Sequence, residues 1–280
     1  MREIKASDIT AAVAELCMRA NCELGDDVYQ ALQNSAAREE SPLGKDILSQ
    51  LVENADIARS EQVPMCQDTG LALVFAELGQ DLHITGGLLS DAINAGVAKG
   101  YSEGYLRKSV VGHPLERKNT GDNTPAVVYT EVVPGDMLKI TVAPKGAGSE
   151  NMSALRMLKP SDGLEGIKKF VVEAVKAAGA NPCPPIIVGV GIGGTMEKAA
   201  LLAKKALLRE VGKHNPNPAD AELEKELLKM VNDTGIGPAG LGGRITALAV
   251  NVETYPCHIA SLPVAVNIQC HAARHREVML

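Results

Sequence analysis

The stretch NPCPPIIVGVGIGGTMEKAALLAKKALL, residues 181–208, decides the fold class. A proline-bounded loop comes first, followed by an apolar run, a glycine-rich turn and an apolar pattern with helical period. This order predicts a buried strand, a turn and a helix in succession. Such alternation is typical of proteins that pack helices against a sheet.

Similar patterns lie on both sides of this stretch. Further helices are predicted at 87–105, 163–178 and 219–232, and strands at 71–78, 83–85, 126–133, 137–144 and 244–253. Residues 7–60 carry three helical patterns, with Ser7-Asp8 as the expected cap of the first and Ser41-Pro42 as the start of the third. We therefore predict a mixed α/β (α+β) fold, in which a helical N-terminal layer precedes interleaved helices and mixed sheets. Since no repeat and no Pro/Ser-rich linker divides the chain, one domain of residues 1–280 is expected.

The composition excludes several classes of function. Hydrophobic residues make up 45% of the chain, which is enough for a packed core, whereas aromatic residues make up only 2%. Few aromatic side chains, a net charge of −6 and no basic arm argue against a nucleic-acid partner. The charged N-terminus differs from a signal peptide, and no segment has the roughly 20 apolar residues of a membrane span. A cytoplasmic protein without membrane contact is expected.

The six cysteines are candidates for metal binding or catalysis, since disulfides are rare in a reducing cytosol. They form no CxxC pair, so any metal site must combine distant segments. Cys17 and Cys22 lie in a helical pattern among apolar residues and are expected to be structural. Cys66 and Cys183 instead lie in proline-containing turns, and Cys257 and Cys270 are each followed by histidine. Spacing alone equally allows ordinary thiols.

The glycine turn GVGIGG at 189–194 matches the GxGxxG pattern of dinucleotide-binding sites. A Rossmann unit would continue into a second strand that ends in an acidic residue, but here HNPNPAD leads into another helix. We interpret the glycines as a site of close packing or of backbone approach to a ligand, and prefer the latter because Cys183 precedes them.

Five motifs resemble those of class I, iron-sulfur-dependent fumarate hydratases and the similar tartrate dehydratases. They occur in order from about residue 60 to the end: CQDTG (66–70), LRKSVV (106–111) with NTGDNTP (119–125), KGAGSEN (145–151), CPPIIVGVGIGGT (183–195) and HIASLPVAVNIQCHAARH (258–275). The resemblance implies a 4Fe-4S cluster bound by three cysteines, with one iron open to substrate. The implied ligands are Cys66, Cys183 and Cys270, with Cys257 as the competing third ligand.

The resemblance also implies roles around that cluster. An open iron acts as a Lewis acid on the hydroxyl of a hydroxy-dicarboxylate, and Asp68 is expected to donate or accept the proton there. In the alternative interpretation, Asp68 only stabilises its turn. Gln67, the backbone around Gly148, and His258 are expected to contact the substrate. Arg107 is expected to pair with a carboxylate, ahead of Arg117 and Lys145.

Members of this family contain a second domain that completes the active site and has no counterpart in these motifs. We therefore expect the α subunit of a two-chain hydro-lyase that works as a hetero-oligomer with a β subunit. The expected reaction interconverts (S)-malate and fumarate, since the length is near that of fumarase α subunits; L-tartrate dehydration is the alternative. An NAD-dependent oxidoreductase and a non-catalytic or redox-sensing cluster carrier are the competing classes.

Overall fold

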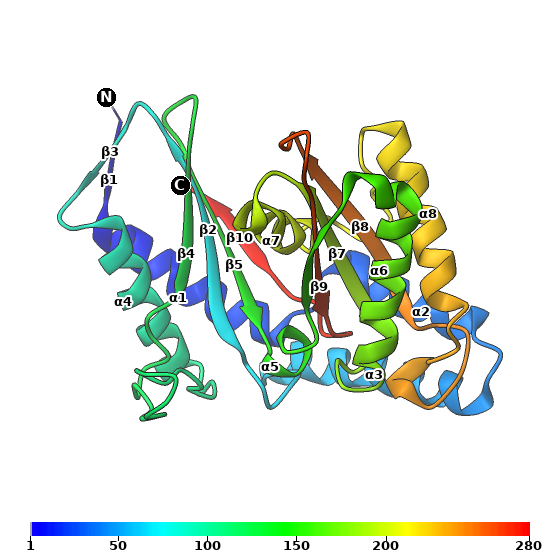
Figure 1. Ribbon diagram of the computed structural model, residues 1–280. Coiled ribbons are helices and arrows are strands. Elements are labelled where there is room, and N and C mark those ends of the chain that lie inside the picture. Colours follow the sequence, from blue (N-terminus) through cyan, green and yellow to red (C-terminus); the bar gives the residue numbers. More distant parts are fainter. Residues whose placement is uncertain (1) are drawn as a thin grey trace. The chain divides into compact units, whose positions relative to one another are not determined.

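The structure is a computed structural model that describes residues 2–280, and these residues form two compact units. Unit 1 contains the residues up to Leu24, Ala55–Ala147 and Arg274–Leu280. Unit 2 contains Gly25–Asn54 and Gly148–Ala273. Each unit has a four-stranded sheet of its own (Figure 1).

The sheet of unit 1 has the order β10-β5-β2-β4. Its central strand β2 (Leu71–Gly79) pairs antiparallel with β5 (Leu138–Lys145) and parallel with β4 (Val127–Val133), and β10 (Arg276–Met279) pairs antiparallel with β5. A separate parallel pair joins β1 (Arg2–Lys5) to β3 (Leu82–Thr85). Strands β2, β3, β4 and β5 match the predicted runs, whereas the four-residue strands β1 and β10 carry little local signal.

Two helices, α1 (Ala6–Cys22) and α4 (Leu89–Glu103), share the hydrophobic core of unit 1 with this sheet. The helices cross closely at Gly96, where an added Cβ would lie 2.6 Å from the Cβ of Val13. Helix α1 follows β1 directly, with Lys5 at its N-cap position, so Ser7 and Asp8 lie within the helix and the expected cap was wrong. The β1–β3 pairing, which the local sequence does not indicate, sets this start.

The sheet of unit 2 has the order β6-β9-β7-β8. Strand β7 (Ile186–Gly193) pairs parallel with β8 (Ala247–Tyr255) and antiparallel with β9 (Leu262–Gln269), which in turn pairs antiparallel with β6 (Ala154–Leu158). Helices α6 (Gly163–Ala178) and α8 (Pro218–Asn232) contribute to one hydrophobic core with the sheet and lie side by side in Figure 1.

Helix α7 (Met196–Ala206) packs against β7 and β9 through small residues, and this contact explains part of the GVGIGG motif. A Cβ at Gly189 would lie 2.1 Å from the Ala203 carbonyl oxygen, and one at Gly191 would lie 2.1 Å from that of Ala199. Side chains larger than hydrogen therefore cannot fit between strand and helix. Residues 189–193 belong to the strand itself, so close packing accounts for these two glycines.

The remaining helices are α2 (Asp26–Arg38), α3 (Pro42–Glu61) and the short α5 (Ala147–Glu150), with 3₁₀ turns at Pro160–Asp162 and Pro238–Gly240. Helix α3 starts at the predicted Pro42, because proline suits the first helical position. Within residues 2–280 no helix combines the length and the apolar character that crossing a membrane requires.

Candidate functional site

The turn that carries Cys66 lies in unit 1, immediately before β2. Cys66 is half-buried and Gln67 is exposed, with 3.5 Å between the Cys66 Sγ and the Gln67 Oε1. The turn is anchored upstream by the Met65 amide, which donates to the Asn21 carbonyl at 3.0 Å. An accessible thiol and an amide side chain are therefore presented together on a fixed backbone.

Asp68 is held by three different hydrogen bonds. Its Oδ1 accepts from the Gly70 amide at 3.0 Å, which is an Asx turn, and its Oδ2 accepts from the Ala147 amide at 2.8 Å. Its carbonyl accepts from Nη2 of Arg274 at 2.5 Å. Asp68 thus makes the hydrogen bond expected of a turn stabiliser. Each carboxylate oxygen retains a second lone pair, so a role in proton transfer stays a prediction.

Gly70 lets this turn lie directly on the backbone of β5. Its φ is +78°, and an added Cβ would lie 2.7 Å from the Lys145 amide nitrogen. The Tyr101 hydroxyl donates to the carbonyls of Thr69 and Gly70 at 2.7 and 3.0 Å, and burial raises the pKa of this phenol. A neutral, buried tyrosine therefore fixes the turn from the α4 side.

The loop that carries Arg107 is tied to the same turn. The Thr69 hydroxyl donates to the Arg107 carbonyl at 2.9 Å, which places the exposed Arg107 next to Thr69. Asn123 connects the two segments: its Nδ2 donates to the Gly70 carbonyl at 3.2 Å and its Oδ1 accepts from the Ser109 amide at 2.7 Å. Unit 1 therefore places Cys66, Gln67 and Asp68 on one turn and the Arg107 backbone against that turn, and their roles at a site stay predictions.

Cys183 and Cys270 lie together in unit 2. The His271 amide donates to the Cys183 carbonyl at 3.4 Å, so the segment that carries Cys270 runs beside that of Cys183. Cys183 is exposed and has a φ of +53°, and Cys270 is half-buried. Both cysteines, whose thiolates are soft metal ligands, therefore lie at the same end of β7.

Gly148 lies near these two cysteines. A Cβ on Gly148 would lie 3.5 Å from the Asn181 carbonyl, and the neighbouring Ser149 hydroxyl lies 3.5 Å from Oε1 of Gln269. Asn181 is two residues before Cys183, and Gln269 directly precedes Cys270. Gly148 itself is exposed within the short helix α5. The backbone around Gly148, which is expected to contact the substrate, thus lies beside two of the expected ligands.

Cys257 and His258 lie at the opposite end of the same sheet. In the β7–β9 register Ile187 pairs with Gln269, while Ile192 pairs with Val264 near the other end. At about 3.3 Å per residue, Ile187 and Ile192 are about 17 Å apart along the strand. Unit 2 therefore does not bring His258 next to Cys183 and Cys270.

A cavity of about 500 Å³ lies at this opposite end, lined by Cys257, His258, Tyr255 and the start of α7. The Cys257 thiol donates to the Ser261 carbonyl at 3.3 Å, and the His258 Nδ1 accepts from the Ala260 amide at 3.1 Å. Both side chains are exposed. The loop is thus ordered by its own hydrogen bonds, at a distance from Cys183.

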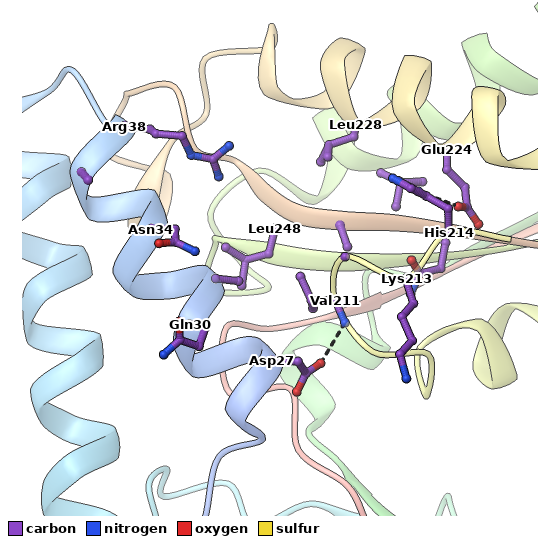
Figure 2. A pocket seen from close by; sticks show the side chains of 16 residues that line it. Asp27, Gln30, Asn34, Arg38, Val211, Lys213, His214, Glu224, Leu228 and Leu248 are labelled. Atoms are coloured by element: carbon purple, nitrogen blue, oxygen red, sulfur yellow. Dashed lines mark hydrogen bonds and ion pairs between the residues drawn. The ribbon is translucent and has the colours of Figure 1, made fainter.

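A second cavity, of about 700 Å³, lies between α2 and β8 in unit 2. Figure 2 shows Asn34 and Arg38 along α2, with Lys213 and His214 on the loop across from them. That loop is held by Asp27, whose carboxylate accepts from the Val211 amide at 2.8 Å. None of the residues predicted for the site lines this cavity.

The cysteines differ in their suitability as ligands. Cys17 is buried, and desolvation raises the pKa of its thiol to about 12, so it stays protonated. Cys66, Cys183 and Cys270 are all accessible. Among residues 2–280 no group of three or more His, Cys, Asp or Glu side chains forms a metal-binding cluster. The segments that carry Cys183 and Cys270 nevertheless run side by side in unit 2, and soft, accessible thiols fit the donor set that an iron-sulfur cluster takes.

The chain is similar to known proteins over nearly its whole length. The family model described as fumarate hydratase (fumerase) matches residues 10–279. A Methanocaldococcus jannaschii protein provisionally named L(+)-tartrate dehydratase subunit alpha is 48% identical over 278 residues, which is 97% of this chain and 96% of the relative. L(+)-tartrate dehydratase subunit alpha of Escherichia coli O157:H7 is 34% identical over 97% of this chain and 90% of its own length.

Proposed function

Because the chain belongs to the fumarate hydratase family, we propose that it is the α subunit of an iron-sulfur hydro-lyase that removes water from a short hydroxy-dicarboxylate. The observation that carries this proposal is the juxtaposition of Cys183 with Cys270, beside Gly148, within one unit. The proposed ligands of a 4Fe-4S cluster are Cys66, Cys183 and Cys270. Cys257 is set aside because it lies at the other end of β7.

When bound, a cluster with one open iron supplies a Lewis acid for the substrate hydroxyl. The chain's own residues bind and orient the substrate around it. Arg107 offers a planar cation to one carboxylate, and Gln67 offers an amide donor to the same end. Asp68, whose carboxylate is oriented by the Gly70 and Ala147 amides, holds the proton that accompanies the leaving hydroxyl.

Within one copy of this chain His258 does not reach a substrate bound beside Cys183 and Cys270, so its predicted contact would come from a second copy of the chain. The length of β7 separates it from Cys183 and Cys270, and a four-carbon dicarboxylate is shorter than the interval of about 17 Å along that strand. A hetero-oligomer that contains more than one α chain would allow this contact, while the β subunit supplies the remaining active-site residues. The relatives' names, which specify subunit alpha, support the need for a partner.

Malate and fumarate are the proposed substrate pair, in line with the description of the family model. L-tartrate is the second candidate, favoured by the names of both relatives. Anaerobic reconstitution with iron and sulfide, followed by titration of the cluster spectrum with each acid, tests the choice. The titration is run with and without the β subunit, and the acid that changes the spectrum and is turned over only with the β subunit is the substrate. Full activity of the isolated chain would contradict the two-chain proposal.

The ligand assignment has its own test. Cys183→Ser is expected to abolish cluster loading, while Cys17→Ser, at a buried thiol in α1, is expected to preserve it. Iron and acid-labile sulfide counted per chain give the result. Equal retention by both variants would refute the assignment of Cys183.

A further inference from the structure

Arg274 carries a buried charge that the roles proposed above do not use. Its side chain is only 4% exposed. Nη2 donates to the Asp68 carbonyl at 2.5 Å, whereas Nε and Nη1 have no hydrogen-bond partner within the described part of the chain. A buried guanidinium with two unmatched donors is expensive unless negative charge lies close by.

The Asp68 carboxylate lies in the same part of unit 1, but it accepts from the Gly70 and Ala147 amides and forms no ion pair with Arg274 in the described residues; the other neighbouring groups supply no negative charge. Burial is the main influence on both Cys22 and Tyr101 and raises the pKa of each, so both are neutral at pH 7, although the Arg274 charge acts in the opposite direction. Glu23 is engaged by Arg276, whose Nη2 lies 3.3 Å from Oε2 of Glu23. Arg276 therefore has a carboxylate partner, and Arg274 has none in the described residues.

The bond from Arg274 joins the C-terminal segment to the turn of Cys66. Asp68 receives this bond on its carbonyl, while its carboxylate accepts from the Gly70 and Ala147 amides. Arg274 thus completes the set of contacts that orient Asp68. Its charge lies beside the turn where the proposed function places a thiolate ligand and a dianionic substrate.

We propose that Arg274 is a positioning residue that fixes the Cys66–Gly70 turn through the Asp68 carbonyl and supplies the buried positive charge that offsets the anionic cluster and dicarboxylate. This inference rests on the proposed function. Arg274 makes no contact with substrate, because its nitrogens are enclosed. It acts through the electrostatic potential at the turn and through the orientation of Asp68.

The test uses the full chain with its β subunit, reconstituted anaerobically, in four forms: wild type, Arg274→Gln, Arg274→Lys and the control Arg276→Gln. Two quantities are measured: the midpoint potential of the cluster, and the Kd of L-malate and of L-tartrate from the cluster spectrum. Arg274→Gln is expected to shift the potential to a more negative value and to raise the Kd about tenfold, as loss of one nearby unit charge implies. Arg274→Lys, which keeps the charge, is expected to shift both quantities much less, and Arg276→Gln is expected to match the wild type.

An Arg274→Gln protein with the potential and Kd of Arg276→Gln would overturn the proposed role of Arg274, and so would equal loss of iron from Arg274→Gln and Arg274→Lys. Loss of iron from Arg274→Gln alone would support the requirement for charge. A wild-type protein that takes up no cluster, or whose cluster responds to neither acid, would instead refute the proposed function.

Discussion

Replacing Glu39 by glutamine is expected to destabilise unit 2 and to loosen the loop that supports Cys183. Glu39 is 1% exposed, and its two carboxylate oxygens accept amide hydrogen bonds from Glu40, Ser41, Arg244 and Ile245 at 2.8 to 3.0 Å. In Glu39→Gln one oxygen becomes an NH₂ group that faces amide donors. Loss of two bonds to a charged acceptor gives an expected cost of about 3 kcal/mol.

Loosening at Glu39 is expected to affect the Cys183 turn, because the glycine loop at 237–243 contacts that turn. The Ala239 amide donates to the Pro184 carbonyl at 2.8 Å, and an added Cβ on Gly240 would lie 2.3 Å from the Cβ of Ala180. Both contacts flank the Cys183 turn. We therefore expect faster amide exchange at residues 239–245 in Glu39→Gln than in the wild type.

The pH dependence gives a second signature of the same carboxylate. Burial, the largest influence, raises the pKa of Glu39, but the backbone hydrogen bonds together outweigh it and hold this pKa below its ordinary value. A lowered folded-state pKa means that the stabilisation is complete above about pH 4.3, the unfolded value, and is lost as the pH falls through the folded pKa. The difference between wild type and Glu39→Gln should therefore shrink below about pH 4.

Urea unfolding at pH 7 and pH 3.5, together with hydrogen exchange, measures these effects. The matched control is Glu40→Gln, since Glu40 has a 71% exposed side chain and pairs with Nε of Arg244 at 3.0 Å. Such a surface pair is worth less than about 1 kcal/mol. Equal stability of the two variants at pH 7, or a difference that does not change with pH, would refute the reasoning.

Two further predictions concern the packing around the site. Gly191→Ala places a Cβ 2.1 Å from the Ala199 carbonyl oxygen, and this overpacking is expected to lower the free energy of unfolding by about 3 kcal/mol. The control is Gly112→Ala, where the nearest atom is 3.8 Å away, and its urea midpoint should change little. Tyr101→Phe removes the hydroxyl shared by two turn carbonyls and is expected to cost about 1 kcal/mol and to speed amide exchange near Gly70; unchanged exchange there would contradict the anchoring role.

The elements that the sequence predicts well are those with strong local patterns. Helix α3 begins at the predicted Pro42, and the runs of β2, β5 and β7 are apolar enough to be recognised alone. Strands β1 and β10 are four residues long and depend on partners far away in the chain, so their sequences indicate little. The start of α1 was misplaced for the same reason, because the β1–β3 pair determines it.

The same difference between local patterns and long-range contacts applies to the residues of the site. The resemblance implied that Arg107 shares a site with Cys66, Gln67 and Asp68; the Thr69 to Arg107 bond places the Arg107 backbone beside their turn, and the roles of these residues stay predictions. Arg274 was missed, because its bond to Asp68 spans 206 residues and no local pattern indicates which arginine is buried. The GVGIGG motif has a clear local pattern but a different cause. The pattern is shared with ligand-binding turns, whereas here Gly189 and Gly191 allow helix packing.

The most direct test of the central claim compares Cys270→Ser with Cys257→Ser after anaerobic reconstitution with the β subunit. Iron per chain and the malate- and tartrate-induced change in the cluster spectrum are measured on both. Because Cys270 lies beside Cys183 and Cys257 lies at the far end of β7, Cys270→Ser should lose the cluster and Cys257→Ser should keep both the cluster and its response. Loss of the cluster from Cys257→Ser, with retention in Cys270→Ser, would contradict the account.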